Sequence, residues 1–167
     1  DYLLELGHNV DVFCRDTNLS NKNLNNIQLS NISNNDIKSL DTLKNVKASD
    51  AISIIAVNSQ GFDSLLSNYA SYFDGINEIV SLTKGIDHKS GLLFHERVED
   101  ILGKDKKYGL ISGPSFAKDL SNRKKMVVSF ASIDDHLSNT LLQTTKSSYF
   151  EMIHTPYLYH IEIAGII

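Results

Sequence analysis

The chain has 167 residues, of which 41% are hydrophobic and 22% charged, and its formal net charge is −4. This length and composition exclude a disordered chain and suit one folded domain with its own core. The negative charge argues against nucleic acid as a partner, and no apolar run approaches the ~20 residues of a membrane-spanning helix. One cysteine, Cys14, allows no internal disulfide and points to a reducing compartment, the cytoplasm.

The first third of the chain predicts little regular structure. Residues 1–6 read as the end of an amphipathic helix that Gly7 stops, and residues 10–14 as a β-rich strand. Residues 16–35 contain eight Asn and no periodic apolar pattern, which predicts a loop. Two short elements follow this loop, a strand over residues 36–38 and a helix over residues 39–46.

From residue 51 onward, strands alternate with helices. Residues 51–57 are almost all apolar and β-branched, which is typical of a strand buried on both faces of a parallel sheet. Ser59 is expected to cap the next helix. The later strands are residues 78–83, 108–111, 126–131 and 150–153. The helices are residues 59–72, 92–102 and 134–146, and a last one that Pro156 opens and that continues to the end of the chain. This alternation predicts an α/β fold with a doubly wound, mostly parallel, Rossmann-like sheet.

Four polar segments follow strands of the predicted sheet. Parallel strands place their carboxyl ends at one edge, where such sheets bind ligands, so we expect these segments to face one crevice. The segments are Arg15, residues 57–59, residues 83–85 and residues 112–117.

Two of these segments hold residues suited to gripping an anion. Lys84 offers a full charge that could neutralise a phosphate or polarise a carbonyl. Gly113 lets backbone approach a ligand, Ser115 adds a hydroxyl, and the N–H groups of Ser115 and Ala117 would be free at the start of a short helix. Taken alone, Lys84 is more simply a surface lysine and Gly-Pro-Ser an ordinary turn, but the two segments together favour a binding site.

Arg15 and Asp16 stand where dinucleotide-binding folds contact the adenosine ribose. An acidic residue there favours NAD and an Arg can hold the extra phosphate of NADP, so the cofactor stays open, as does a solvated pair in a loop. The six histidines have no metal-ligand spacing, which predicts no metal site. His95 and Glu96 are interpreted as a solvated helix face.

Five stretches of the chain match the motifs of one enzyme family. Residues 6–16 are similar to Asn-Gly-His-x-Val…Arg-Asp, and residues 49–57 to an Ala-Asp-x-Ile-x-x-Ala-Val strand. Residues 83–86 match Thr-Lys-Gly-Leu/Ile, and residues 162–166 are similar to Glu-Leu-x-Gly-Ala. Residues 111–119, Ile-Ser-Gly-Pro-Ser-Phe-Ala-Lys-Asp, are the most specific match. Together these stretches resemble bacterial NAD(P)-dependent glycerol-3-phosphate dehydrogenase.

The resemblance implies reversible hydride transfer between NAD(P)H and dihydroxyacetone phosphate, which gives sn-glycerol 3-phosphate for phospholipid synthesis. It implies that Lys84 is catalytic and contacts both substrate and cofactor, and that Gly113 and Ser115 contact the substrate. The cofactor, NAD or NADP, would be held by Arg15, Val57, Ser59, Lys84 and Ala117. A cytoplasmic homodimer is implied for the full-length enzyme.

The resemblance also implies elements outside this chain. The family's Gly-rich phosphate-binding turn would precede Asp1, and its catalytic Lys would follow Ile167 directly. Residues 1–154 are therefore expected to form a Rossmann domain without its first strand and Gly-rich loop, and residues 155–167 to lead into a helical substrate domain. Such a fragment would bind dinucleotide weakly and would not turn over substrate. Asn58 replaces the family's usual Pro, which would loosen that turn.

Two other functions stay open at this point. A β-hydroxyacid or 6-phosphogluconate type dehydrogenase shares the dinucleotide domain, although the Gly-Pro-Ser-Phe-Ala run disfavours it, and a substrate screen would decide. A non-catalytic module that senses NAD(H) would bind the dinucleotide largely without Lys84. Folds of this kind host many reactions, so the substrate rests on the resemblance alone.

Overall fold

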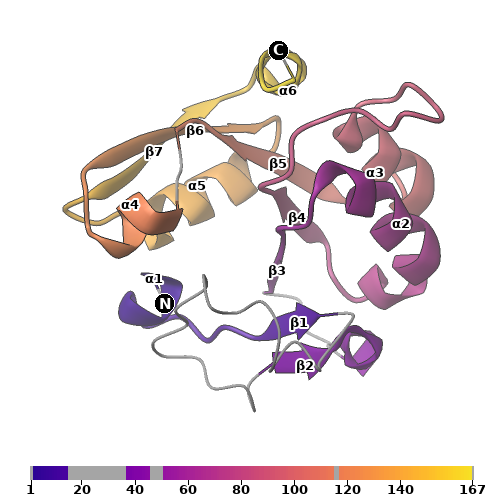
Figure 1. The fold of residues 1–167 in the computed structure, drawn as a ribbon, viewed down its shortest axis with the longest axis horizontal. Helices are drawn as coiled ribbons and strands as arrows, with labels where there is room; N and C mark the ends of the chain where they lie inside the picture. The colour runs from indigo at the N-terminus through magenta and orange to yellow at the C-terminus, as the bar shows by residue number, and fades with distance from the viewer. Residues whose placement is uncertain (1, 15–36, 46–50, 115–116, 167) are drawn as a thin grey trace.

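A five-stranded sheet forms the centre of the computed structural model, which describes residues 2–14, 37–45, 51–114 and 117–166 (Figure 1). Its strands are β3 (Ile52–Ile55), β4 (Glu78–Ser81), β5 (Lys107–Ser112), β6 (Met126–Ser132) and β7 (Phe150–Thr155), in that spatial order. The pairs β3–β4, β4–β5 and β6–β7 are parallel, and β5–β6 is antiparallel. The predicted α/β class with a mostly parallel sheet is confirmed.

A second, smaller sheet pairs β1 (Val12–Cys14) with β2 (Ile37–Ser39) in parallel, and it lies below β3 in Figure 1. The 3-10 helix η4 (Leu40–Asn45) follows β2 directly and buries Leu40 and Leu43 in the main core. The short helix α1 (Tyr2–Glu5) places the Tyr2 ring edge-on against Tyr149 and Phe150. The predicted loop over residues 16–35 lies outside the described residues.

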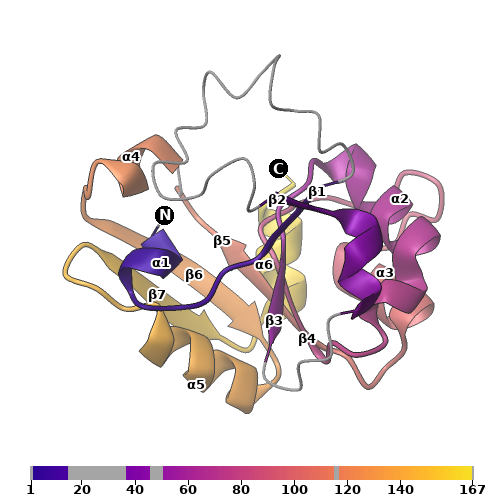
Figure 2. The same ribbon diagram turned by 90° about the horizontal axis from the view of Figure 1, so that it is seen from below.

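Helices cover both faces of the five-stranded sheet (Figure 2). One face packs against α2 (Ser59–Tyr69), α3 (Phe94–Leu102) and α6 (Leu158–Ala164), and the other against α5 (Asp135–Thr144). Successive strand residues alternate between two apolar clusters: Ile79 and Leu110 belong to the first, Val80 and Ile111 to the second. The central strands β4 and β5 are buried on both faces, as is typical of parallel strands between two layers of helices. The same burial was predicted for β3, but Ile54 on this edge strand is 40% exposed.

The cap of α2 differs from the prediction. Asn58, not Ser59, is the N-cap residue, and its Oδ1 accepts the Gly61 N–H at 2.7 Å. This bond satisfies one of the donors that every helix start leaves open. The expectation that Asn58 loosens the turn is therefore wrong, because its side chain ties the turn to the helix.

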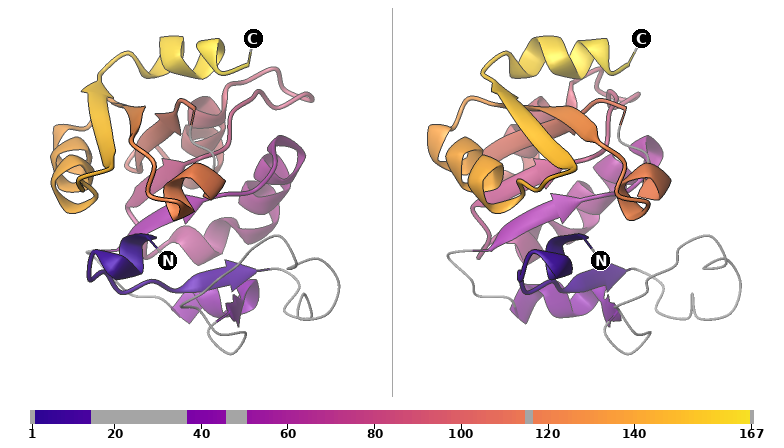
Figure 3. Two further views of the ribbon diagram at one scale, coloured as in Figure 1. Left: turned by 60° about the vertical axis from the view of Figure 1, so that its left-hand side comes forward. Right: turned by 90° about the vertical axis from the view of Figure 1, so that its left-hand side faces the viewer.

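The C-terminal end of α2 and the start of the last helix also differ from the prediction. The helix predicted over residues 59–72 is α up to Tyr69 and continues as the 3-10 helix η5 (Ala70–Phe73). The last helix begins at Leu158, two residues after Pro156, because the Tyr157 N–H binds the Thr155 hydroxyl in a turn that precedes it. Helix α6 then ends at Ala164, and Figure 3 shows it leaving the end of β7 and running back across the sheet.

Candidate functional site

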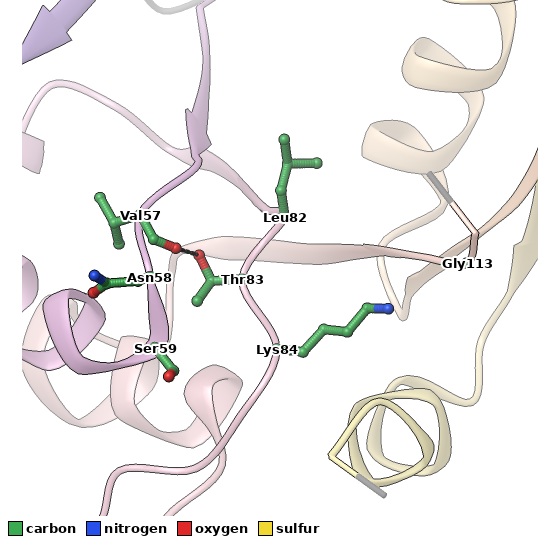
Figure 4. A pocket seen from close by; sticks show the side chains of 7 residues that line it. All are labelled: Val57, Asn58, Ser59, Leu82, Thr83, Lys84 and Gly113. Atoms are coloured by element: carbon green, nitrogen blue, oxygen red, sulfur yellow. Dashed lines mark hydrogen bonds between the residues drawn. The ribbon is translucent and has the colours of Figure 1, made fainter. Parts of the chain in front are cut away.

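A pocket of about 480 Å³ opens at the carboxyl ends of β3, β4 and β5 (Figure 4). This is the edge of a parallel sheet at which α/β folds bind ligands. Its lining comes from the segments after the three strands: Val57, Asn58 and Ser59 after β3, Leu82, Thr83 and Lys84 after β4, and Gly113 after β5.

The structure gathers part of the predicted site in this pocket. Four predicted site residues line it, and these are Val57, Ser59, Lys84 and Gly113. Ala117 is exposed as the first residue of α4 (Ala117–Ser121) and does not line the pocket. Arg15 and Ser115 lie outside the described residues, so their roles stay predictions.

Hydrogen bonds fix the ends of β3 and β4 side by side beneath the pocket. The Leu82 N–H donates to the Ile55 carbonyl at 2.9 Å, and the Thr83 hydroxyl donates to the Val57 carbonyl at 2.7 Å. The buried Ser81 hydroxyl accepts the Thr83 N–H at 2.9 Å and donates to the Thr83 carbonyl at 3.0 Å. The turn that presents the next residue, the lysine, is thus held on both sides.

Two glycines let the chain pass close to its neighbours at the pocket. Gly85 has a φ of +146°, and a Cβ there would lie 3.2 Å from the Phe94 ring and 3.3 Å from Ser59 Cβ. Gly113 has the same φ, and a Cβ there would lie 3.3 Å from Val128 Cα on β6. Side chains rarely adopt such a φ, so both positions require glycine.

Lys84 supplies the positive charge of the pocket. Its side chain is half-buried and extends toward Gly113 (Figure 4). Within the described part of the chain, its ammonium has neither a carboxylate nor a hydrogen-bond partner. By contrast, the exposed lysines 38, 124 and 146 each pair with a carboxylate at 2.6–2.7 Å. An ammonium that no carboxylate neutralises gives the pocket a positive charge, so the pocket favours a ligand oxygen that carries negative charge.

The start of α2 adds to this preference for anions. The positive end of the helix dipole lies at Asn58 and Ser59, both on the pocket wall. The pocket lining also includes two apolar side chains, Val57 and Leu82, which are 37% and 44% exposed. An ammonium, a hydroxyl and a helix N-terminus beside an apolar wall fit a phosphate-bearing dinucleotide or a phosphorylated substrate. Leu82 was missed from the sequence; its place directly before Thr83-Lys84-Gly85 was the available signal.

The interpretation of His95 as part of a solvated face is wrong. Its side chain is 19% exposed, and its Nδ1 lies 2.5 Å from Oε2 of the fully buried Glu162. Glu96 accepts the Leu93 N–H at 2.7 Å and so belongs to the start of α3. Over residues 2–14, 37–45, 51–114 and 117–166, no group of three or more His, Cys, Asp or Glu could hold a metal ion. No helix in those ranges is long and apolar enough to cross a membrane.

Comparison with known proteins gives one consistent result. A family model described as "NAD-dependent glycerol-3-phosphate dehydrogenase N-terminus" matches residues 2–138. The glycerol-3-phosphate dehydrogenase (NAD(P)+) of Beijerinckia indica is 31% identical over 120 residues, which cover 72% of this chain and 36% of the relative. That of Alcanivorax borkumensis is 24% identical over 165 residues, 95% of this chain and 48% of the relative. The crystal structure of glycerol-3-phosphate dehydrogenase from Coxiella burnetii shares the fold, with a TM-score of 0.79 and 22% identity over 98% of this chain and 51% of that one. This chain thus spans between about a third and a half of these relatives.

Proposed function

This chain belongs to the NAD-dependent glycerol-3-phosphate dehydrogenase family, and from that membership we propose that it is the dinucleotide-binding part of an enzyme that interconverts dihydroxyacetone phosphate and sn-glycerol 3-phosphate. Residues 1–154 form the Rossmann domain and residues 155–167 lead into a helical substrate domain. The activity belongs to a polypeptide of the relatives' full length that contains this chain, called the full-length enzyme below. The chain alone binds dinucleotide weakly and does not turn over.

The observation that carries the proposal is Lys84. Lys84 is half-buried, and its ammonium, without a partner in the described residues, lies in a pocket at the carboxyl edge of the sheet. Such a group stabilises negative charge that develops on a reacting oxygen, because it is already in place and partly shielded from water. The pocket walls supply what a phosphorylated ligand needs besides, a helix N-terminus and small residues that permit close approach.

Each site residue predicted from the sequence has a role under this proposal. When bound, NADH or NADPH would supply a hydride to the carbonyl carbon of dihydroxyacetone phosphate, and NAD or NADP would accept it from the carbinol carbon of glycerol 3-phosphate. Lys84 donates a hydrogen bond to the substrate oxygen that gains or loses charge. Gly113 leaves room for the substrate, and Ser115 offers it a hydroxyl. The cofactor is held by Val57, Ser59, Lys84, Ala117 and Arg15.

The proposal extends to the setting of the full-length enzyme, a cytoplasmic homodimer whose product serves phospholipid synthesis. The single cysteine, Cys14, supports a reducing compartment. Light scattering during size-exclusion chromatography should give twice the mass of one chain, and a monomer at micromolar concentration would contradict the dimer.

The test measures NADH and NADPH oxidation driven by dihydroxyacetone phosphate in the full-length enzyme. Lys84→Ala should lower kcat/KM by about 10²–10³-fold, the usual loss when one donor to a developing oxyanion is removed. Lys146→Ala removes an exposed lysine that pairs with Glu151, and it should stay within about twofold of the parent. The cofactor that is oxidised faster settles the choice between NAD and NADP.

Three results would contradict the proposal. A Lys84→Ala enzyme with parental kcat/KM would remove Lys84 from the mechanism. Turnover of a β-hydroxyacid or of 6-phosphogluconate in place of dihydroxyacetone phosphate would replace the substrate. Dinucleotide binding that survives Lys84→Ala, without turnover of any of these, would indicate a module that senses NAD(H).

A further inference from the structure

A buried ion pair joins α6 to the first turn of α3. The Glu162 carboxylate is fully buried; its Oε2 lies 2.5 Å from His95 Nδ1, and its Oε1 accepts the His95 backbone N–H at 3.2 Å. The N-cap residue of α3 is Leu93, which has no side-chain oxygen to accept such a bond. Helix N-termini favour a negative charge that accepts their free N–H groups. Glu162 therefore supplies from α6 the acceptor that α3 lacks.

The buried position of Glu162 requires that its carboxylate keep a charged partner. A buried charge that loses its partner is strongly destabilising. Tyr108, from β5, is buried nearby; its hydroxyl makes no hydrogen bond within the described residues, although the Ser81 hydroxyl lies near enough to affect its pKa. Burial and then the charge of Glu162 raise the pKa of Tyr108, so this phenol stays neutral. Of the two titratable groups His95 and Tyr108, it is therefore His95 that can balance the charge of Glu162.

One turn after Glu162, the same helix touches Lys84. A Cβ added at Gly165 would lie 2.9 Å from Lys84 Cδ and 3.2 Å from Lys84 Cγ. The alkyl stem of Lys84 therefore lies against the end of α6, and Figure 4 shows it extending past this helix toward Gly113. Any side chain at position 165 would displace the middle of the lysine stem, not only its flexible tip.

We propose that Glu162 is a positioning residue: its pair with His95 fixes α6 on α3, which holds Gly165 against Lys84 and directs the ammonium into the pocket. The inference rests on the proposed role of Lys84 in the reaction. It assigns to the pair a task beyond holding two helices together, because the helix end that it anchors is the surface on which the lysine lies.

The first test compares Glu162→Gln with the parent in the full-length enzyme. The amide keeps the shape and one acceptor but loses the charge, so α6 loosens on α3. We expect kcat to fall about 10–100-fold, as it does when a catalytic group is misplaced by about an ångström. His136→Asn is the matched control, because it removes an exposed pair of the same kind, His136 with Glu78 at 3.1 Å, and it should leave kcat unchanged.

A double-mutant cycle separates positioning from general destabilisation. In a Lys84→Ala background, Glu162→Gln should cost no more than about twofold in kcat, because it acts through the lysine that is already gone. A purely structural role would give the same loss in both backgrounds and would overturn the proposal.

Gly165→Ala provides a second route if Glu162→Gln fails to fold. It displaces the lysine stem and leaves Glu162 and His95 in place, so kcat should fall while the His95 imidazole titrates as in the parent. Parental kcat in Gly165→Ala would overturn the proposal.

A readout without turnover keeps this inference apart from the proposed function. Reductive ¹³C-methylation labels the lysines, and the Lys84 signal is identified by its loss in Lys84→Arg. We expect Glu162→Gln and Gly165→Ala to move this signal, and His136→Asn to leave it in place. An unmoved signal in both variants contradicts the positioning role. A moved signal in an enzyme whose activity ignores Lys84 supports positioning and contradicts the proposed function.

Discussion

Gly113 and Gly7 both have a positive φ but differ in their surroundings. Gly113 has a φ of +146° and would bring a Cβ within 3.3 Å of Val128 Cα. Gly7 has a φ of +87° and no atom within 4 Å of the same added Cβ. An L side chain at either site strains the backbone by about 1–2 kcal/mol. At Gly113 an added side chain also crowds the neighbouring strand β6. Comparing substitutions at the two glycines therefore separates the cost of backbone strain from the cost of crowding.

We predict that Gly113→Ala lowers the free energy of unfolding by about 2–4 kcal/mol, because crowding adds to backbone strain. Gly7→Ala should lower it by only about 1 kcal/mol. In the full-length enzyme, Gly113→Ala should also lower kcat/KM for dihydroxyacetone phosphate at least about tenfold, because the end of β5 moves away from Lys84. Urea unfolding and steady-state kinetics measure both effects, and equal losses at the two glycines would show that the contact with β6 is unimportant.

Residue chemistry was predictable from the sequence where it was local. Lys84 and Gly113 belong to polar segments that follow predicted strands, and both line the pocket. The pair of His95 with Glu162 was not found, because 67 positions separate the two residues and no local pattern links them. The available signal was the place of Glu162 four residues after the buried Leu158, on the apolar side of its helix. A carboxylate on a buried face implies a buried partner.

Helices α2 and α5 begin with the same capping bond. Asn58 Oδ1 accepts the Gly61 N–H, and Asp134 Oδ1 accepts the Leu137 N–H, both at 2.7 Å. The first cap lines the pocket, whereas the second starts a helix on the other face of the sheet. Removing either cap should lower the stability of its helix by the same amount. A difference between the two variants in dinucleotide binding therefore reports on the pocket.

We predict that Asn58→Ala and Asp134→Ala each lower the free energy of unfolding by about 1 kcal/mol, the usual loss for a cap. Asn58→Asp should restore stability, because the carboxylate also caps α2. It should nevertheless weaken dinucleotide binding to the full-length enzyme by about 5–10-fold, since it sets a negative charge beside the ligand phosphates. Urea unfolding and calorimetric titration with NADH provide the comparison. Parental NADH affinity in Asn58→Asp would place the phosphates away from α2.

At the scale of elements, apolar periodicity predicted the types of strand and helix but not all their ends. Helix α2 gives way to η5 at Ala70, which the run of helical spacing through Tyr72 did not suggest. Lys106, far along the chain, contacts the end of η5: its ammonium donates to the carbonyls of Phe73 and Ile76, both at 3.0 Å. A tertiary donor thus stabilises the end of this segment, and no local pattern reveals it.

For the whole molecule, the crevice could be predicted because of a topological rule. Strands β3, β4 and β5 are parallel, so the segments after them had to meet at one edge. The return of α6 across the sheet, which brings Gly165 to Lys84, could not be predicted in the same way. It depends on β6 and β7 running opposite to β5, and the sequence indicated a mostly parallel sheet without showing where the direction reverses.

The contact between α3 and α6 gives the molecule a pH-dependent stability. The hydrogen bond that the His95 imidazole donates to the Glu162 carboxylate raises the pKa of His95, and this outweighs the burial that opposes it; the charges of Glu162, Glu96 and Glu99 add to the increase. Tyr108, which also faces Glu162, stays neutral over this range. Because the pKa of His95 is raised in the folded state, the pair contributes its full stabilisation at pH values below the unfolded-state pKa of about 6.5. Its contribution is then lost as the pH rises through the folded-state pKa.

We predict that the free energy of unfolding falls as the pH rises from about 6.5 through the raised pKa of His95, and that His95→Asn flattens this slope. Urea unfolding of the chain at a series of pH values from about 5 to 9 measures it, and this window brackets an ordinary histidine pKa of about 6.5. The control is His136→Asn: His136 is 72% exposed, so its pairing with Glu78 contributes little and the slope should persist. Asp87 acts at the other end of the range, since hydrogen bonds from Ser90 lower its pKa and its contribution is lost only as the pH falls through that lowered value. A His95→Asn chain that keeps the parental slope above about pH 6.5 would mean that the α3–α6 contact does not depend on the charge of the imidazole, and that packing alone holds α6 in place.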